Sequence, residues 1–103
     1  LYLDILSYLE AKLPNLPPRQ DLYSSYINVL RYGNSPGIHV DAPYYVPENK
    51  TVLVYLNPVW QPDWGGETIF FDDDLDSKRL VQPRAGRVVM FDGRTHTQAQ
   101  QVI

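Results

Sequence analysis

Short extended segments separated by turn residues fill most of this chain and limit the folds that it can adopt. After residue 20, runs of β-branched and aromatic residues alternate with clusters of glycine, proline, asparagine and aspartate. This pattern is typical of strands joined by tight turns. Several short strands at this spacing predict a β-sandwich or a small β-barrel. The expected strands are Tyr26–Tyr32, Ile38–Asp41, Thr51–Asn57, Glu67–Phe71, Leu80–Gln82, Gly86–Phe91 and Gln98–Ile103.

The first segment differs from the rest because its apolar residues recur at helical spacing. Tyr2, Ile5, Leu6, Leu9 and Leu13 follow one another every one to four positions and mark one face of a helix. We therefore expect a helix over residues 1–12, from Leu1 to Lys12. Three prolines within the next six residues, at 14, 17 and 18, prevent the helix from continuing.

The length of 103 residues fits one domain with a single core. We expect residues 1–20 to form the helix and a linker, and residues 21–103 to form the β-fold. The predicted fold class is mainly β with an N-terminal helix (α+β). The chain begins at Leu1 and stops at Ile103 within an apolar run, so we expect it to be a fragment of a longer protein.

Composition narrows the classes of partner. A net charge of -3 argues against a surface built for nucleic acid or anionic lipid, because both require clustered Lys and Arg. No apolar run approaches the roughly 18 residues of a membrane span. The chain has no Cys, so any metal site must use His and carboxylate ligands. We expect a soluble protein that binds neither nucleic acid nor membrane, with the cytoplasm favoured as its compartment and the oligomeric state open.

Three residues suggest a metal site. His39 and Asp41 stand two apart in a predicted strand, so their side chains project to the same face. His96 follows the predicted strand 86–91, and a neighbouring strand of a small barrel could bring it alongside. Two imidazoles and one carboxylate on one side of an ion suit an oxygen-activating Fe(II) centre. A His-x-Asp triplet also arises by chance, and a single His is more often structural, so the motif needs support from its context.

That context is a series of further motifs in a fixed order. The chain resembles the prolyl 4-hydroxylase-like branch of the 2-oxoglutarate and Fe(II)-dependent oxygenase superfamily from about Tyr26 to Val102. The resemblance implies a double-stranded β-helix, which is a jelly-roll or cupin-like barrel, here predicted to lack its C-terminal strand. The motifs are Arg31-Tyr32-Gly33, His39-Val40-Asp41, the segment Thr51 to Asn57, the segment Trp64 to Phe70, the segment Pro83 to Phe91, and His96.

The resemblance also implies an activity. Such an enzyme uses Fe(II), 2-oxoglutarate as cosubstrate and O2, with ascorbate as a further cofactor, and it hydroxylates a substrate C–H while releasing succinate and CO2. His39, Asp41 and His96 would act as metal ligands, with no catalytic residue beyond them. A prolyl residue of a peptide is the first candidate substrate, and a free amino acid or another small molecule is the next.

Residues for the cosubstrate are carried over by position. Tyr55 is similar to a tyrosine that faces 2-oxoglutarate in the family, and Tyr32 is a second candidate. The family's basic partner for the distal carboxylate lies further along the chain than the last His, so we expect it beyond Ile103. Arg87 and Arg94 are the alternatives within this chain.

Aromatic residues in two loops are candidates for substrate binding. Residues 42–50 and 58–63 flank the ligand strand and are expected to rim the pocket. Aromatic rings there could hold a peptide or a sugar, or they could pack over the end of the barrel. The candidates are Tyr44, Tyr45, Trp60 and Trp64.

Two other functions remain open. A cupin-like metal enzyme that works without a 2-oxo acid needs more His ligands than the two in this chain. A non-catalytic β-barrel binding module that lacks the cosubstrate site would fit a chain without the distal basic residue.

Overall fold

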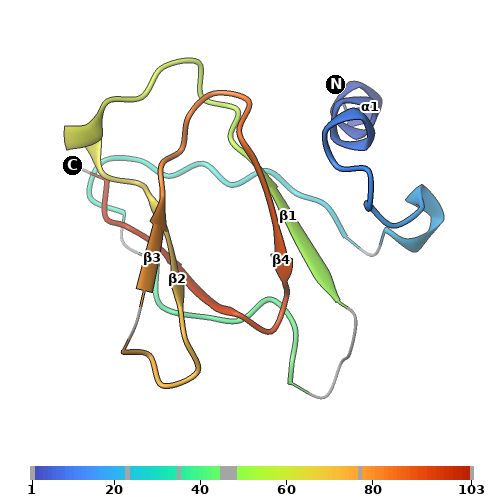
Figure 1. Cartoon of the computed structure of the whole chain (residues 1–103). Coiled ribbons are helices and arrows are strands. Elements are labelled where there is room, and N and C mark those ends of the chain that lie inside the picture. The colour runs from blue at the N-terminus through green and yellow to red at the C-terminus, as the bar shows by residue number, and fades with distance from the viewer. Residues whose placement is uncertain (1, 23, 35, 45–48, 77, 103) are drawn as a thin grey trace.

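Two antiparallel sheets and one helix make up the regular structure of this chain (Figure 1). The computed structural model describes residues 2–22, 24–34, 36–44, 49–76 and 78–102. The strands form the sheets β1–β4 and β3–β2–β5, so the predicted mainly β fold class is confirmed. No helix in these ranges is long and apolar enough to cross a membrane. The elements are α1 (Tyr2–Lys12), the 3-10 turns η1 (Arg19–Asp21) and η2 (Pro62–Trp64), and the strands β1 (Lys50–Val54), β2 (Thr68–Phe71), β3 (Lys78–Val81), β4 (Val88–Asp92) and β5 (His96–Ala99).

Turn residues at the strand ends set where pairing starts and stops. Gly65 and Gly66 have φ angles of 72° and 83°, a conformation that residues with a side chain adopt at a cost, and β2 begins two residues later. Pro83 follows β3 closely and cannot donate to a ladder. The five strands therefore lie within a few residues of the predicted ones. The largest shift is at β5, which begins at His96 and not at residue 98.

The two sheets face one another across a shared interior. The rings of Phe70 on β2 and Phe91 on β4 meet edge to face, with centroids 4.9 Å apart. Tyr55, just after β1, places its hydroxyl 2.6 Å from Oγ1 of Thr68 on β2. We call the sides of the two sheets that carry these residues the inner faces. Among the residues that the structure describes, the two sheets do not close into a barrel.

Helix α1 lies to one side of the sheets, close to β1 (Figure 1). Leu9 is its buried residue, with 8% of its surface exposed. Tyr8 donates a hydrogen bond from its hydroxyl to the carbonyl of Gly86, in the turn before β4. A Cβ at position 86 would lie 3.1 Å from that hydroxyl, so glycine allows the close approach. The predicted helix is thus confirmed over its described part and is fixed to the turn that starts β4.

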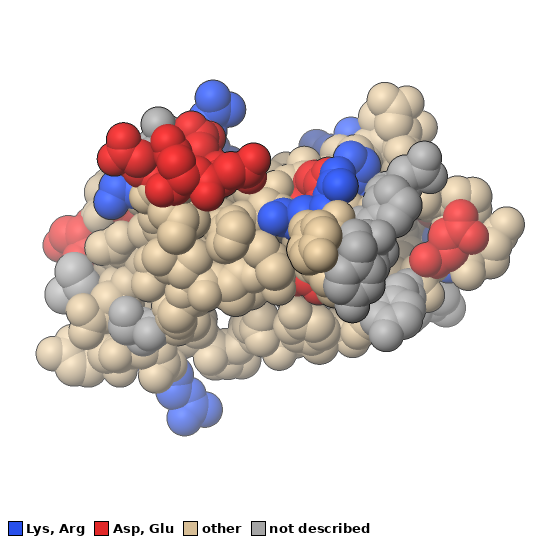
Figure 2. Space-filling model, turned by 90° about the horizontal axis from the view of Figure 1, so that it is seen from below, with Lys and Arg blue, Asp and Glu red and all other residues tan. Residues whose placement is uncertain are grey.

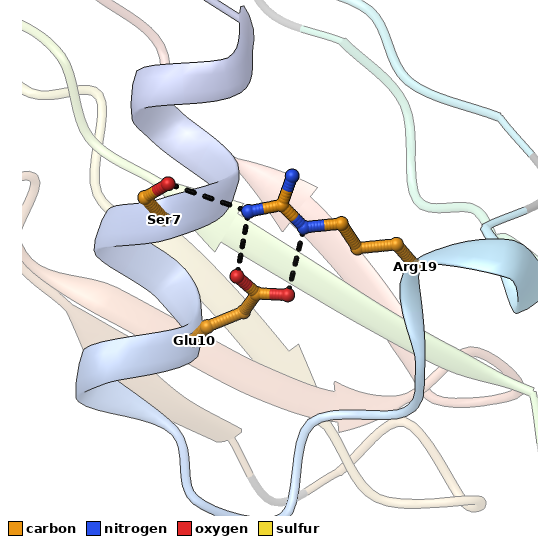
Figure 3. A network of polar contacts seen from close by, with 3 residues as sticks. All are labelled: Ser7, Glu10 and Arg19. Carbon is orange, nitrogen blue, oxygen red and sulfur yellow. Dashed lines mark hydrogen bonds and ion pairs between the residues drawn. The ribbon is translucent and has the colours of Figure 1, made fainter.

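The linker after α1 turns back and binds the helix (Figure 3). Arg19 donates from Nε and Nη2 to the two carboxylate oxygens of Glu10, at 2.8 and 2.6 Å, and from Nη2 to Oγ of Ser7 at 3.3 Å. The hydrogen bond from Arg19 lowers the pKa of Glu10. A bidentate pair of this kind has a defined geometry, so it sets the direction of the chain after the prolines.

Two of the predicted strands are corrected by the structure. Residues 26–32 form no strand, and Ile27 and Val29 are 63% and 70% exposed. Strand propensity depends on packing against a paired neighbour, and no ladder partner for this segment lies within the described ranges. The predicted strand over residues 38–41 is reduced to one bridge, between His39 and Thr97.

The loop between β2 and β3 carries four aspartates, at positions 72, 73, 74 and 76. Figure 2 shows acidic side chains gathered over this loop. All four are exposed, and the backbone turns through a hydrogen bond from the amide of Leu75 to the carbonyl of Asp72. They form no metal-binding group with other described side chains, so the loop is a solvated turn.

Candidate metal centre

His39 and Asp41 come together as the sequence predicts. Nε2 of His39 lies 3.4 Å from Oδ1 of Asp41. Nδ1 of the same ring lies 3.1 Å from the carbonyl of Gly37, and a proton on Nδ1 would leave Nε2 free as a metal ligand. Two ligands at right angles around an octahedral divalent ion, each about 2.1 Å from it, are about 3 Å apart. The spacing of this pair therefore fits a shared divalent ion.

The second carboxylate oxygen of Asp41 already has a partner. Oγ1 of Thr51, on β1, donates to Oδ2 of Asp41 at 2.8 Å. Thr51 stands opposite Phe91 in the β1–β4 ladder and therefore lies on the inner face. The bond connects the ligand segment to the sheet and leaves Oδ1 turned toward His39.

The backbone beside Asp41 is held by the turn between β4 and β5. The amides of Asp41 and Ala42 both donate to the carbonyl of Gly93, at 2.9 and 2.8 Å, and the amide of Gly93 donates to the carbonyl of Asn49 at 2.9 Å. A Cβ at position 93 would lie 2.6 Å from Oδ1 of Asn49 and 3.3 Å from the Cβ of Ala42. The absence of a side chain at Gly93 is what allows this packing.

His96 is near this pair in the ladder but belongs to a different face. His39 exchanges backbone hydrogen bonds with Thr97, at 3.0 and 2.9 Å, so those two residues share a face. Thr97 in turn is paired with Phe70, whose ring points to the interior. Side chains alternate along a strand, so His96 projects from the outer face. Its Nδ1 is buried and has no hydrogen-bond partner among the residues that the structure describes.

The structure thus brings together two of the three predicted ligands. Within the described part of the chain, no three His, Asp or Glu side chains are close enough to hold a metal ion. His39 and Asp41 place two possible donors close together, and the imidazole of His96 lies one position away from the bridge partner of His39.

A cavity of about 510 Å³ is lined by residues of both sheets. Its wall includes Phe70 and Phe91, which stand directly opposite Thr97 and Thr51 in their ladders. The apolar part is completed by Phe71, Val81, Val89 and Met90, and the polar part consists of Asp72, Lys78, Arg79 and Thr95.

Arg79 is a cavity residue that the sequence interpretation missed. It stands opposite Phe70 in the β2–β3 ladder and so lies on the inner face, in the same row as Thr97 and His39. It makes no ion pair or hydrogen bond with the described residues. The predicted strand began at residue 80, two residues later than β3, and this hid the alternation that would have indicated Arg79.

The predicted cosubstrate residues have different environments. Tyr55 is half-buried between the sheets, and burial raises the pKa of its phenol. Tyr32 lies on a turn and is 83% exposed. Arg94 is held by Asp92 at 2.6 Å, and this bond keeps the pKa of the Asp92 carboxyl well below its usual range. Arg87 is exposed and donates to the carbonyl of Gln82 at 3.0 Å.

The structure describes three of the four predicted substrate residues. Trp60 donates from Nε1 to the carbonyl of Gly65 at 2.8 Å, and the guanidinium of Arg84 lies 5.9 Å from its ring centroid. Trp64 and Tyr44 are 39% and 86% exposed. Tyr45 lies outside the described residues.

Comparison with known proteins gives one match. A family model described as the 2OG-Fe(II) oxygenase superfamily matches residues 27–102, which is more than half of the chain. No curated protein and no solved structure matches. The matched range contains both sheets, the pair His39 and Asp41, and His96.

Proposed function

Because the chain belongs to the 2OG-Fe(II) oxygenase superfamily, we propose that it is a 2-oxoglutarate-dependent hydroxylase that binds iron through His39, Asp41 and His96. The observation that carries the proposal is the pair formed by Nε2 of His39 and Oδ1 of Asp41, 3.4 Å apart within the matched range. Two imidazoles and one carboxylate are the ligand set of non-haem Fe(II) oxygenases.

His96 completes the set only if its side chain turns to the inner face at the start of β5. Two observations support this assignment. His96 is the residue next to Thr97, the bridge partner of His39, so it lies one position along β5 from the pair's neighbour. Its buried Nδ1 lacks a partner, and an unsatisfied buried nitrogen costs about 1–3 kcal/mol that a bound ion would offset.

Bound Fe(II) would supply the redox chemistry that couples decarboxylation of 2-oxoglutarate to hydroxylation of a C–H bond. The chain's own part is to bind and orient the reactants. Arg79 is the basic residue proposed to receive a carboxylate, because it lines the cavity from the inner face, opposite Phe70. Tyr55 is placed to limit the space between the sheets, and the apolar wall would exclude water from the reacting groups.

The fold proposed for the whole unit is the double-stranded β-helix. One of its sheets would be β3–β2–β5, extended by the bridge between His39 and Thr97, and the other would contain β1 and β4. Support comes from the inner faces, which meet through Phe70 and Phe91.

The substrate proposed first is a prolyl residue of a peptide, followed by a free amino acid. This choice rests on the order of motifs around His39, residues 64–70 and residues 83–91. The exposed ring of Trp64 is proposed as a contact for a peptide.

The test is formation of succinate from 2-oxoglutarate in the presence of Fe(II) and O2. We expect turnover by the protein, none by His39→Ala, and normal turnover by Gln20→Ala, an exposed substitution beside α1. Succinate formation that survives His39→Ala would reject the proposal. A panel of prolyl peptides and free amino acids then ranks the substrate classes.

A second candidate, a binding module without a metal, is favoured by one observation. The described side chains do not assemble three donors around one point. The protein would then bind no Fe(II) or Co²⁺ at all, which a direct metal titration measures before any turnover is tested.

A further inference from the structure

The carboxylate of a metal ligand must be held in one orientation if it is to bind through one oxygen. The side chain of Asp41 is 24% exposed, so packing alone does not fix its rotation about the Cβ–Cγ bond. The backbone is fixed separately, since the amides of Asp41 and Ala42 both donate to the carbonyl of Gly93. What remains to be set is the direction of the two carboxylate oxygens.

Thr51 sets that direction. Its Oγ1 donates to Oδ2 of Asp41 at 2.8 Å, and this turns Oδ1 toward Nε2 of His39. A β-branched residue in a strand has few side-chain rotamers, so its hydroxyl is a rigid donor. Thr51 also lies within the ladder, opposite Phe91, and so its backbone is fixed by the sheet.

We infer that Thr51 is a positioning residue of the proposed iron site, whose hydroxyl makes Asp41 a ligand through one oxygen. This inference rests on the proposed function, because it assigns Thr51 a role toward the ion that His39 and Asp41 would hold. The hydroxyl donates to Oδ2 and so opposes binding of the ion through both carboxylate oxygens. Binding through both oxygens would use a coordination position that another ligand needs. Thr51 is ten residues away from Asp41 in the sequence, so no local motif reveals it.

The experiment titrates the protein with Co²⁺, an air-stable probe for divalent sites, and follows its visible absorption. We expect Thr51→Val, which keeps the shape but removes the donor, to lower Co²⁺ affinity about 10–100-fold. The Co²⁺ bands should also change shape as Asp41 changes its mode of binding. Thr51→Ser keeps the hydroxyl and should restore most of the affinity.

Thr68→Val is the matched control. It removes another inner-face hydroxyl, one that contacts Tyr55 and not Asp41, so Co²⁺ affinity should stay at the level of the unsubstituted protein. Urea unfolding of the metal-free proteins shows whether Thr51→Val and Thr68→Val have similar stabilities. Should Thr51→Val fail to fold, Thr51→Ala takes its place.

The outcomes separate this inference from the proposed function. Failure of the unsubstituted protein to bind Co²⁺ rejects the iron site itself. Normal binding by the unsubstituted protein together with equal affinity in Thr51→Val overturns the role of Thr51 alone. An equal loss in Thr68→Val also overturns it, because the effect would then come from general destabilisation.

Discussion

The two halves of the proposed metal centre differ in how well the protein holds them. His39 and Asp41 have fixed neighbours, with Gly37 at one ring nitrogen, Thr51 at one carboxylate oxygen and Gly93 at the backbone. His96 starts a strand, faces the other side of the sheet, and has a buried nitrogen without a partner. His39 and Asp41 are therefore held in place before any ion binds, whereas the buried nitrogen of His96 has no hydrogen-bond partner among the described residues.

This difference indicates that the two halves contribute differently to ion binding and to stability. Preassembly of His39 and Asp41 lowers the entropy lost when an ion binds, because their positions are set before it arrives. The unpartnered imidazole of His96 has the opposite property, since its burial costs free energy until something binds it. We therefore expect substitutions on the two halves to differ in their effects on metal affinity and on stability.

The largest effect should follow removal of a preassembled ligand. Asp41→Ala deletes a ligand, and loss of groups that only orient ligands already lowers metal affinity about 10–100-fold, so Co²⁺ affinity should fall by more than about 100-fold. Asp21→Ala, at an exposed carboxylate in η1, is the matched control and should bind Co²⁺ normally. Equal affinities for the two variants would show that the ion is not held at Asp41, and the comparison between the halves would lose its basis.

The next effect concerns the cavity that residues of both sheets line. Arg79→Gln removes the guanidinium from the cavity wall and should weaken 2-oxoglutarate binding to the Co²⁺-loaded protein about tenfold, because a charged hydrogen bond contributes about 1.5–3 kcal/mol. Calorimetric titration measures this. Arg31→Gln makes the same chemical change at an exposed position outside the cavity and should have no effect. If Arg79→Gln binds 2-oxoglutarate as tightly as Arg31→Gln, the carboxylate is received elsewhere.

The sequence predicted the strands of the two sheets because each strand carries β-branched or aromatic residues and has a glycine or proline within a few residues of at least one end. It also predicted the pair His39 and Asp41, since alternation along an extended segment places residues two apart on one face. The prediction of a strand over residues 26–32 was wrong, because strand propensity does not show whether a neighbouring strand is available for pairing.

The relation of His96 to the pair could not be read from the sequence. It depends on register, and a shift of one residue moves a side chain to the other face. The register here is set by the turn at Gly93 and by the pairing of Phe70 with Thr97, which are contacts between distant segments. The proposed roles of Thr51 and Arg79 could not be predicted either, because they also depend on contacts between distant segments.

A smaller effect should appear in the free energy of unfolding when His96 is replaced. His96→Leu replaces a buried ring whose Nδ1 has no partner and should raise the free energy of unfolding of the metal-free protein by about 1 kcal/mol. His39→Leu should bring no such gain, because that ring is 53% exposed and its Nδ1 contacts the carbonyl of Gly37. Urea unfolding in the presence of a chelator measures both. A destabilised His96→Leu would mean that the ring of His96 is already satisfied, and the contrast between the halves would disappear.

The smallest effect concerns Tyr55, which crosses from one sheet to the other. Burial raises the pKa of its phenol in the folded protein, while the unfolded value is about 10. The neutral phenol therefore contributes stability that is present below pH 10 and is lost as the pH rises toward the folded pKa. Tyr55→Phe cannot ionise, so its free energy of unfolding should fall less steeply between about pH 9 and pH 11 than that of the unsubstituted protein.

The same measurement tests whether the space between the sheets is dry near the metal centre. Desolvation is the largest cause of the raised pKa, and the hydrogen bond with Thr68 opposes it. Thr68→Val removes that opposing bond and keeps the phenol, so its stability should fall at least as steeply with pH as that of the unsubstituted protein. Parallel curves for Tyr55→Phe and the unsubstituted protein would mean that water reaches the phenol, and then the space between the sheets could not shield the reactants beside His39 and Asp41.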